Sequence, residues 1–203
     1  TDLPPPLDLH AMDADPHREF ALWFDHAVAA GIHEPEAIAL ATAGADGRPS
    51  VRMVLLRGAG PEGYVWFTNA QSRKGGQLSE NPHAAIVAHW AALGRQIRIE
   101  GPVTPATAAV SDAYFASRDR RSQIGAWASH QSEPLTDRAE LTDRIAELTA
   151  SYGADPVPRP AHWGGYVLTP ILFEFWQHAA NRLHDRILYT PDGDRWRRTR
   201  LSP

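Results

Sequence analysis

A segment near the carboxyl end, EFWQHAANRLHDR, carries two arginines and two histidines within the ten positions that follow its tryptophan. Arg182, His184 and Arg186 stand at alternate positions, so a regular strand would place all three side chains on one face. A strand that only builds a core does not need them, because a guanidinium buried without a partner is strongly destabilising. Guanidinium forks suit phosphate, and imidazole titrates near neutral pH. The cluster therefore predicts an anionic ligand.

Three further segments carry cations, and each has a plainer interpretation beside the functional one. In FTNAQSRKGGQL, residues 67–78, hydroxyls and two cations precede two glycines at an expected helix start, which suits a phosphate but is also typical of a solvated turn. In RDRRSQIGAWASHQS, residues 118–132, three arginines surround an apolar patch, which favours a polar ligand or a charged surface loop anchored by Trp127. RMVLLR, residues 52–57, by itself indicates only two solvated strand ends.

Composition excludes several classes of protein. The 203 residues predict one domain, and the net charge of -4 argues against general affinity for nucleic acid. The chain has no cysteine, which excludes thiolate chemistry and disulfides, and its histidines match no metal-ligand spacing, so we expect no metal. No apolar run reaches the length of a membrane span, and the first residues do not resemble a signal peptide. We expect a cytoplasmic protein without membrane contact.

Periodicity and turn chemistry predict the elements that must position these residues. Residues 1–16, rich in proline and aspartate, read as a mobile arm, and apolar spacing over 19–30 predicts an amphipathic helix. Further helices are expected at 106–117 and at 136–152, the latter with Thr136 as N-cap and Ala139, Ile145 and Leu148 facing inward. Strands are expected at 37–44, 50–57, 64–69, 84–92, 95–103, 165–177, 185–190 and 195–201. Strands so closely spaced predict a mainly β (α+β) antiparallel barrel with peripheral helices.

The same segments, in this order, resemble the pyridoxine/pyridoxamine 5′-phosphate oxidase family. The likeness spans almost the whole chain and rests on RMVLLR, FTNAQSRKGGQL, RQIRIEG, SQIGAWASHQS, EFWQ, RLHDRI and the terminal RLSP. It implies an FMN-binding split β-barrel of Greek-key type, in a homodimer with FMN at the subunit interface. The activity implied is oxidation of pyridoxine or pyridoxamine 5′-phosphate to pyridoxal 5′-phosphate, with hydride passing to flavin N5 and dioxygen reduced to hydrogen peroxide.

The resemblance also assigns residues to each ligand. The implied FMN contacts are Arg52, Met53, Val54, Leu55, Phe67, Thr68, Ser72, Arg73, Lys74, Gln96, Gln131, Ser132, Trp176 and Arg186. The substrate phosphate is assigned to Arg57, Tyr114, Arg118 and Ser122, and the pyridine ring to Arg182 and His184, which are the implied catalytic residues.

Three positions depart from the family pattern. Arg57 stands where lysine is usual, Asp119 where proline commonly follows the arginine, and His178 where the family has glycine. These changes leave the substrate less determined than the cofactor. Two alternatives therefore stay open: an oxidase of secondary metabolism resembling the phenazine-biosynthesis flavin enzymes, and a non-catalytic flavin- or heme-binding module on the same barrel.

Overall fold

Several strands in this protein alternate buried and more exposed residues, so each of these strands turns one face to a shared core. In the computed structural model, which describes residues 5–203, β1 (Ala37–Ala43) buries every second side chain, and β5 (His83–Trp90) and β6 (Arg95–Pro105) follow the same period. The other strands are β2 (Pro49–Leu55), β3 (Gly58–Gly60), β4 (Gly63–Asn69), β7 (Trp163–Leu168), β8 (Leu172–Gln177), β9 (Asp185–Asp192) and β10 (Arg195–Arg200).

All strand pairs are antiparallel, and the sheet curls because β6 changes partner along its length. Its first part pairs with β8 and its last residues with β7, which continues the sheet to β4 and β3. The main path runs β10-β9-β8-β6-β5-β1-β2. Gly101 lies at the change of partner, where a Cβ atom would stand 1.9 Å from the carbonyl oxygen of Thr169. Only glycine allows the backbones to approach so closely there.

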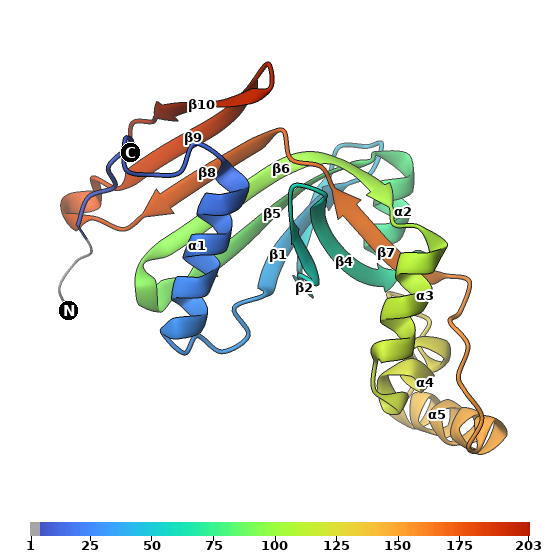
Figure 1. Ribbon diagram of the computed structural model, residues 1–203. Coiled ribbons are helices and arrows are strands. Elements are labelled where there is room, and N and C mark those ends of the chain that lie inside the picture. Colours follow the sequence, from blue (N-terminus) through green and yellow to red (C-terminus); the bar gives the residue numbers. More distant parts are fainter. Residues whose placement is uncertain (1–4) are drawn as a thin grey trace.

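Helices lie around the sheet. They are α1 (Pro16–Ala29), α2 (Arg73–Glu80), α3 (Ala108–Ser117), α4 (Arg120–Ala128) and α5 (Arg138–Tyr152). Figure 1 shows α1 lying across one face of the sheet, and α3, α4 and α5 grouped beyond β4 and β7. This arrangement confirms the mainly β architecture with peripheral helices. No helix among residues 5–203 is long and apolar enough to cross a membrane.

The core between α1 and the sheet is largely aromatic. Phe20, Trp23 and Ala27 of α1 are buried, as the spacing of residues 19–30 predicts. Trp23 meets the edge of Phe175 on β8 at 5.1 Å, and Phe20 meets Tyr64 on β4 at 5.0 Å. Asp15 caps the helix by accepting a hydrogen bond from the backbone N–H of His17. The helix thus joins the two halves of the curled sheet.

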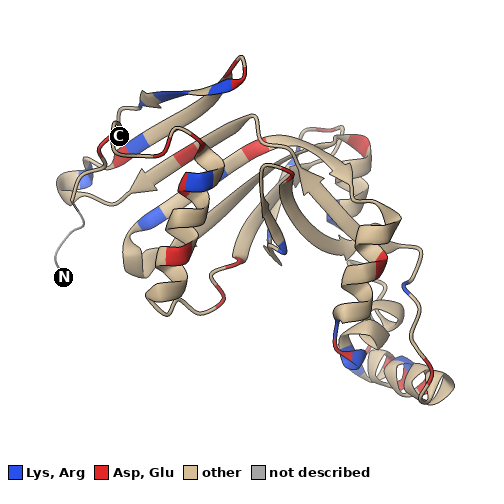
Figure 2. Ribbon diagram, viewed as in Figure 1, with Lys and Arg blue, Asp and Glu red and all other residues tan. Residues whose placement is uncertain are grey.

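The arm expected to be mobile is packed against the sheet over its described part, and residues 1–4 lie outside the described residues. Leu7 is 9% exposed, and its backbone N–H donates to Asp185 at the start of β9. Arg198 of β10 donates to the carbonyl oxygens of Leu9 and Met12. Figure 2 shows the basic residues of β10 as blue stretches. The difference arises because arginines distant in sequence satisfy the carbonyl groups of an irregular segment.

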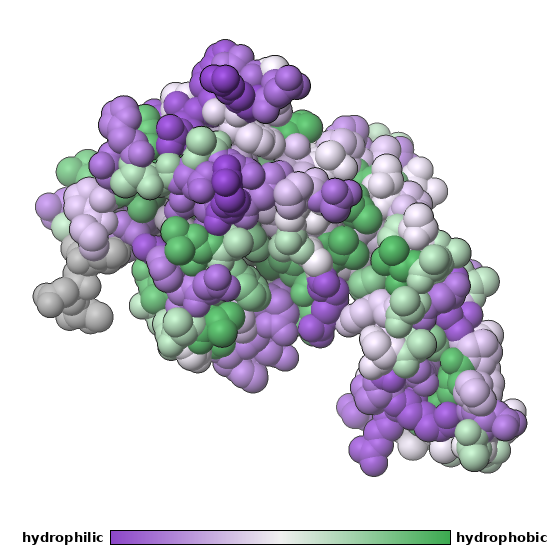
Figure 3. Space-filling view, viewed as in Figure 1, coloured by the Kyte–Doolittle hydropathy of each residue, from purple (hydrophilic) through white to green (hydrophobic). Residues whose placement is uncertain are grey.

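Two local expectations about α5 are wrong. Of its three residues expected to face inward, Ala139 and Ile145 are exposed, and only Leu148 is partly buried, against the small core around Phe115 and Trp163. The N-cap is Asp137 rather than Thr136. The helix extends away from the sheet, and Figure 3 shows the surface over that end of the molecule as mainly hydrophilic.

Residues 120–128, considered above as part of a loop, form α4, with Asp119 as N-cap. An aspartate at the N-cap is a strong local signal for the start of a helix.

Two adjacent glycines in α2 provide a test of how this helix is held. A Cβ atom on Gly75 would lie 2.1 Å from the carbonyl oxygen of Ala70, whereas one on Gly76 would meet nothing within 4 Å. Gly76→Ala should stabilise the protein by up to about 1 kcal/mol through helix propensity. Gly75→Ala should destabilise it by about 1–3 kcal/mol through overpacking. Denaturant unfolding of both variants at one protein concentration tests this, and equal midpoints would contradict the packing described here.

Candidate functional site

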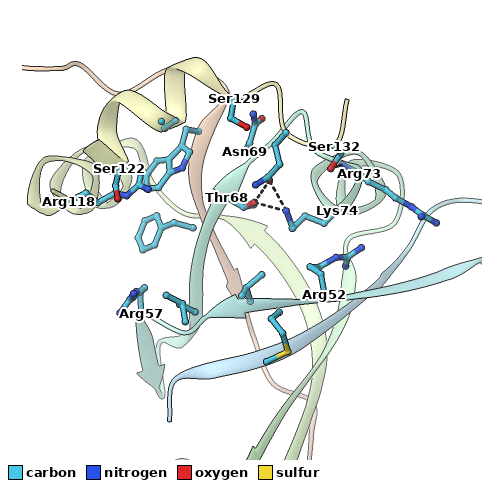
Figure 4. Close-up of a pocket in the computed structure, with 18 of the residues that line it drawn as sticks. Arg52, Arg57, Thr68, Asn69, Arg73, Lys74, Arg118, Ser122, Ser129 and Ser132 are labelled. Atoms are coloured by element: carbon cyan, nitrogen blue, oxygen red, sulfur yellow. Dashed lines mark hydrogen bonds between the residues drawn. The ribbon is translucent and has the colours of Figure 1, made fainter. Parts of the chain in front are cut away.

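A hollow with a volume of about 940 Å³ lies between β2, β4, α2, α3 and α4. Figure 4 shows its cationic and hydroxyl side chains entering from several elements. The hollow brings together most residues that the resemblance assigns to FMN and to the substrate phosphate. They are Arg52, Met53, Val54, Leu55, Arg57, Phe67, Thr68, Arg73, Lys74, Tyr114, Arg118, Ser122, Gln131 and Ser132. Their roles toward a ligand stay a prediction.

Lys74, at the start of α2, is a buried cation surrounded by neutral acceptors. Its Nζ donates to Thr68 Oγ1 at 3.0 Å, Ser72 Oγ at 3.2 Å and Gln131 Oε1 at 2.8 Å, and the residue is 8% exposed. Burial lowers the pKa of Lys74 to about 8, and the charge of Arg52 contributes to the lowering. A cation held in this way favours an anionic ligand that can compensate its charge.

Arg52 on β2 repeats this pattern. Its guanidinium donates to Leu40 O at 3.1 Å, to Thr42 Oγ1 at 2.6 Å, and to Ser50 and Gln77 as well. Burial lowers its pKa, and the neighbouring charge of Arg73 lowers it further. In the described residues, the hydrogen-bond acceptors of Arg52 and Lys74 are hydroxyls, amides and a carbonyl rather than carboxylates. This end of the hollow therefore has uncompensated positive charge beside a helix N-terminus, which suits phosphate.

A second cationic group lies at the other end of the hollow, on a stack of aromatic rings. Phe67 stacks on Tyr114 with ring centroids 4.0 Å apart, and Arg118 lies over Trp163 at 4.8 Å. Nη1 of Arg118 is buried and has no hydrogen-bond partner in the described part of the chain. Burial lowers the pKa of Arg118. An unpaired buried donor of this kind is costly in the free protein, so an acceptor from a ligand would complete it.

Asp119, one of the departures from the family pattern, has a local structural role. Its side chain accepts from the backbone N–H of Ser122 and caps α4. Hydrogen bonds from Ser122 lower the pKa of Asp119, and the charge of Arg118 adds to this lowering. The carboxylate nevertheless lines the hollow and brings a negative charge close to the second cationic group.

The remaining predicted residues lie outside this hollow. Gln96, Trp176 and Arg186 form one row across β6, β8 and β9, as neighbours in the sheet. Ser72 is buried at the N-cap of α2, where it contacts Lys74 rather than the open space. Arg182 and His184 belong to the turn between β8 and β9 and do not line this hollow of their own chain.

The expectation that Arg182, His184 and Arg186 share one face of a strand is wrong. β9 begins only at Asp185, and Arg182 ends a 3-10 turn, Ala180–Arg182, with a backbone φ of 62°. His184 instead packs on Trp176, with ring centroids 4.6 Å apart, and its Nδ1 accepts a hydrogen bond from the backbone N–H of Ala179. Two successive non-glycine residues with positive φ, Asn181 and Arg182, break the alternation.

Arg186 has a partner that the sequence analysis missed. Its Nε donates to Glu174 at 2.7 Å, and Arg98 donates to the other oxygen of Glu174 at 2.5 Å, so a carboxylate that is 3% exposed lies between two guanidinium groups. Burial alone raises the pKa of Glu174, but the hydrogen bonds from Arg186 and Arg98 outweigh it and the pKa is lowered. Arg98 and Glu174 each alternate with apolar neighbours in the sequence, and this pattern was the signal from which a cross-strand ion pair could have been predicted.

Comparison with known proteins identifies the family. Residues 24–152 match the family described as "Pyridoxamine 5′-phosphate oxidase", and residues 163–203 match the "Pyridoxine 5′-phosphate oxidase C-terminal dimerisation region". The chain belongs to the pyridoxamine 5′-phosphate oxidase family. A family member from Rubrobacter xylanophilus, named pyridoxine/pyridoxamine 5′-phosphate oxidase, is 51% identical over 94% of this chain and 88% of its own length. One of the same name from Gluconobacter oxydans is 51% identical over 97% and 98%.

Solved structures agree with this membership of the oxidase family. PhzG from Burkholderia lata, crystallised with tetrahydrophenazine-1-carboxylic acid, superposes with a TM-score of 0.90 at 35% identity over 96% of each chain. An FMN-binding protein related to pyridoxamine 5′-phosphate oxidase from Nostoc punctiforme has a TM-score of 0.72 at 17% identity, covering 95% of this chain and all of its own, and shows the shared fold. The resemblance to the family and the split-barrel fold are therefore confirmed.

The lowered pKa of Lys74 predicts how binding of a phosphate at this end of the hollow depends on pH. A phosphate needs the protonated amine, which the free protein loses as the pH rises through about 8. FMN, which the resemblance assigns here, should therefore bind up to about ten-fold more weakly at about pH 9 than at about pH 7. Fluorescence titration measures this. The Lys74→Met variant should bind FMN weakly at both pH values, with little difference between them. An unchanged pH dependence of FMN binding in this variant would contradict the assignment of Lys74 to the phosphate.

Proposed function

We propose that this protein is an FMN-dependent oxidase that converts pyridoxine or pyridoxamine 5′-phosphate to pyridoxal 5′-phosphate. The observation that carries the proposal is the presence of two separate cationic groups in one hollow, Lys74 with Arg52 at one end and Arg118 with Arg57 at the other. Two phosphate-bearing ligands lying next to each other would account for both. The names of relatives at about half identity support the same reaction.

The residues of the first group fit FMN. Lys74, Arg73 and Arg52 would hold its phosphate, since their charges are otherwise uncompensated at the N-terminus of α2. The ring would lie along β2 at Met53, Val54 and Leu55, with Phe67 and Gln131 beside it. A volume of about 940 Å³ lies within the usual range for cofactor sites. When bound, FMN supplies the hydride acceptor at N5 and passes the electrons to dioxygen, which yields hydrogen peroxide.

The second group would hold the substrate by its phosphate. Arg118 offers an unpartnered Nη1 fixed over Trp163, and Arg57, Tyr114 and Ser122 line the same region. Held at this end, the substrate has its pyridine ring directed toward the middle of the hollow. The contribution of these residues to the rate is proximity and orientation of the carbon that is oxidised.

A homodimer would bring in the remaining residues. Trp176, Arg182, His184 and Arg186 all belong to the segment that matches the family's dimerisation region, residues 163–203, and none of them lines the hollow of their own chain. We infer that each hollow is completed by the turn after β8 of the partner subunit. The strained backbone at Arg182 is consistent with a turn shaped for a ligand rather than for stability.

Arg182 and His184 would then act on the substrate ring. The hydrogen bond from the Ala179 N–H to His184 Nδ1 leaves the proton of the neutral imidazole on Nε2, where it can be donated to the substrate. Arg182, which is exposed in the single chain, would orient the ring and polarise the substituent of the oxidised carbon.

One specific observation favours a second candidate, an oxidase acting on a larger ring. PhzG superposes with a TM-score of 0.90, and its crystallised ligand carries a carboxylic acid and no phosphate. The cationic group formed by Arg57 and Arg118 favours the phosphorylated substrate, because a dianion makes better use of two guanidinium groups than a single carboxylate does.

Turnover tests the proposed function. Purified protein loaded with FMN should oxidise pyridoxine and pyridoxamine 5′-phosphates with release of peroxide, and activity with neither would favour the second candidate. Arg182→Leu should lower kcat/KM by at least about a hundred-fold, because orientation of the reacting carbon is lost. The variant should retain its yellow colour, since Lys74 and Arg52 are unchanged. Wild-type turnover by Arg182→Leu would remove Arg182 from the mechanism.

Hybrid dimers test whether two chains share a site. Lys74→Met damages the hollow and Arg182→Leu damages the turn, so each pure variant should be inactive. Co-expression of both in equal amounts yields hybrid dimers with one intact site of two, and activity should return to about a quarter of the wild-type value. If the hollow and the turn of a single chain formed the site, hybrids would have no intact site and no activity would return.

A further inference from the structure

Arg57 lies between two hollows, and the structure pairs it with a carboxylate on the side away from the candidate substrate site. It lines the main hollow with Arg118 and Tyr114, and it also lines a second hollow of about 680 Å³ between α1 and the end of β2. Glu36 lines the second hollow only. Nη1 of Arg57 is 3.6 Å from Oε1 of Glu36, with the two side chains 33% and 28% exposed.

The backbone holds both residues of this pair in place. Leu56 donates its N–H to the carbonyl oxygen of Glu36 at 2.9 Å, which extends the β1–β2 ladder by one residue beyond Ala37 and Leu55. Arg57 donates its N–H to Val65 O on β4 at 2.7 Å. The indole of Trp90 donates to the carbonyl oxygen of Pro35 at 3.0 Å. The side chains of Glu36 and Arg57 therefore emerge from fixed points and meet at the boundary between the two hollows.

The geometry of the pair leaves the guanidinium available. A separation of 3.6 Å is an ion pair but too long for a strong charge-assisted hydrogen bond. The other charged groups that line the main hollow near Arg57 are Arg118, whose pKa burial and the charge of Arg57 both lower, and Asp119. Arg57 thus lies between a cation that repels it and a carboxylate that attracts it toward the second hollow.

We infer that Glu36 weakens the binding of the substrate phosphate by competing with it for Arg57. This inference rests on the proposed function for the identity of the substrate. A phosphate dianion bound between Arg57 and Arg118 draws the guanidinium away from Glu36 and is itself repelled by the carboxylate. The product carries the same phosphate, so Glu36 weakens its binding as well and affects substrate and product alike.

The test is Glu36→Gln in the full-length protein loaded with FMN, so that the first phosphate site is filled. The amide keeps the shape of the side chain and removes its charge. The dissociation constant for inorganic phosphate, measured by calorimetry, should fall about three-fold or more, as should KM for pyridoxine 5′-phosphate, while kcat changes less than about two-fold. The difference in phosphate affinity between Glu36→Gln and the wild-type protein should narrow at high ionic strength. Damage to the site would weaken binding, so a gain in affinity separates competition from a structural role.

The matched control is Glu147→Gln, which makes the same chemical change at an exposed position on α5 and should alter neither constant. An unchanged or raised dissociation constant for phosphate in Glu36→Gln would overturn the inference. The measurement of phosphate binding does not depend on turnover. If the wild-type protein oxidises neither pyridoxine nor pyridoxamine 5′-phosphate, the proposed function fails. Tighter phosphate binding by Glu36→Gln would still support the competition at Arg57.

Discussion

Positive charge that is buried without a carboxylate partner in the described part of the chain is the constraint on which the site depends. Lys74 is almost fully buried, yet its partners are two hydroxyls and an amide oxygen. Arg52 is held by hydroxyl, amide and carbonyl oxygens. Burial disfavours the charged forms of both groups, as their lowered pKa values indicate. A bound phosphate would compensate this charge, and its binding would stabilise the folded state.

The rest of the fold can tolerate such a site because its core is large and apolar. Trp23, Trp66, Trp90, Phe173 and Phe175 are all buried, and they pack α1 and both parts of the curled sheet into one cluster. Burial of aromatic side chains of this size contributes much of the stability of a domain. The cationic hollow lies outside this cluster, against a separate small core around Phe115 and Trp163. Stability and ligand binding are therefore supplied by different parts of the molecule.

The contrast between paired and unpaired cations distinguishes the two roles of arginine in this chain. Glu174 lies between Arg98 and Arg186 and compensates both on the outer face of β6, β8 and β9. Among residues 5–203, no carboxylate is bonded to Arg118, and its Nη1 has no hydrogen-bond partner. Arg57 is intermediate, with a carboxylate near enough to attract it but not to form a strong hydrogen bond. The degree of pairing determines how strongly each guanidinium can attract a phosphate.

Sequence alone determined the periodic elements and the family. The apolar runs over 37–44 and 50–57 predicted the strands that pair as β1 and β2, and apolar spacing predicted α1, because these patterns arise from the local geometry of strand and helix. The assignment of cationic residues to the FMN and substrate phosphates came from the motifs shared with the oxidase family. Tertiary structure alone decided that Arg182 and His184 leave the strand, since the turn before β9 is held by the hydrogen bond from Ala179 to His184 and the packing of His184 on Trp176. It also decided which cations meet a carboxylate, because Glu174 and Arg98 lie 76 positions apart in the sequence and become neighbours only when β6 pairs with β8.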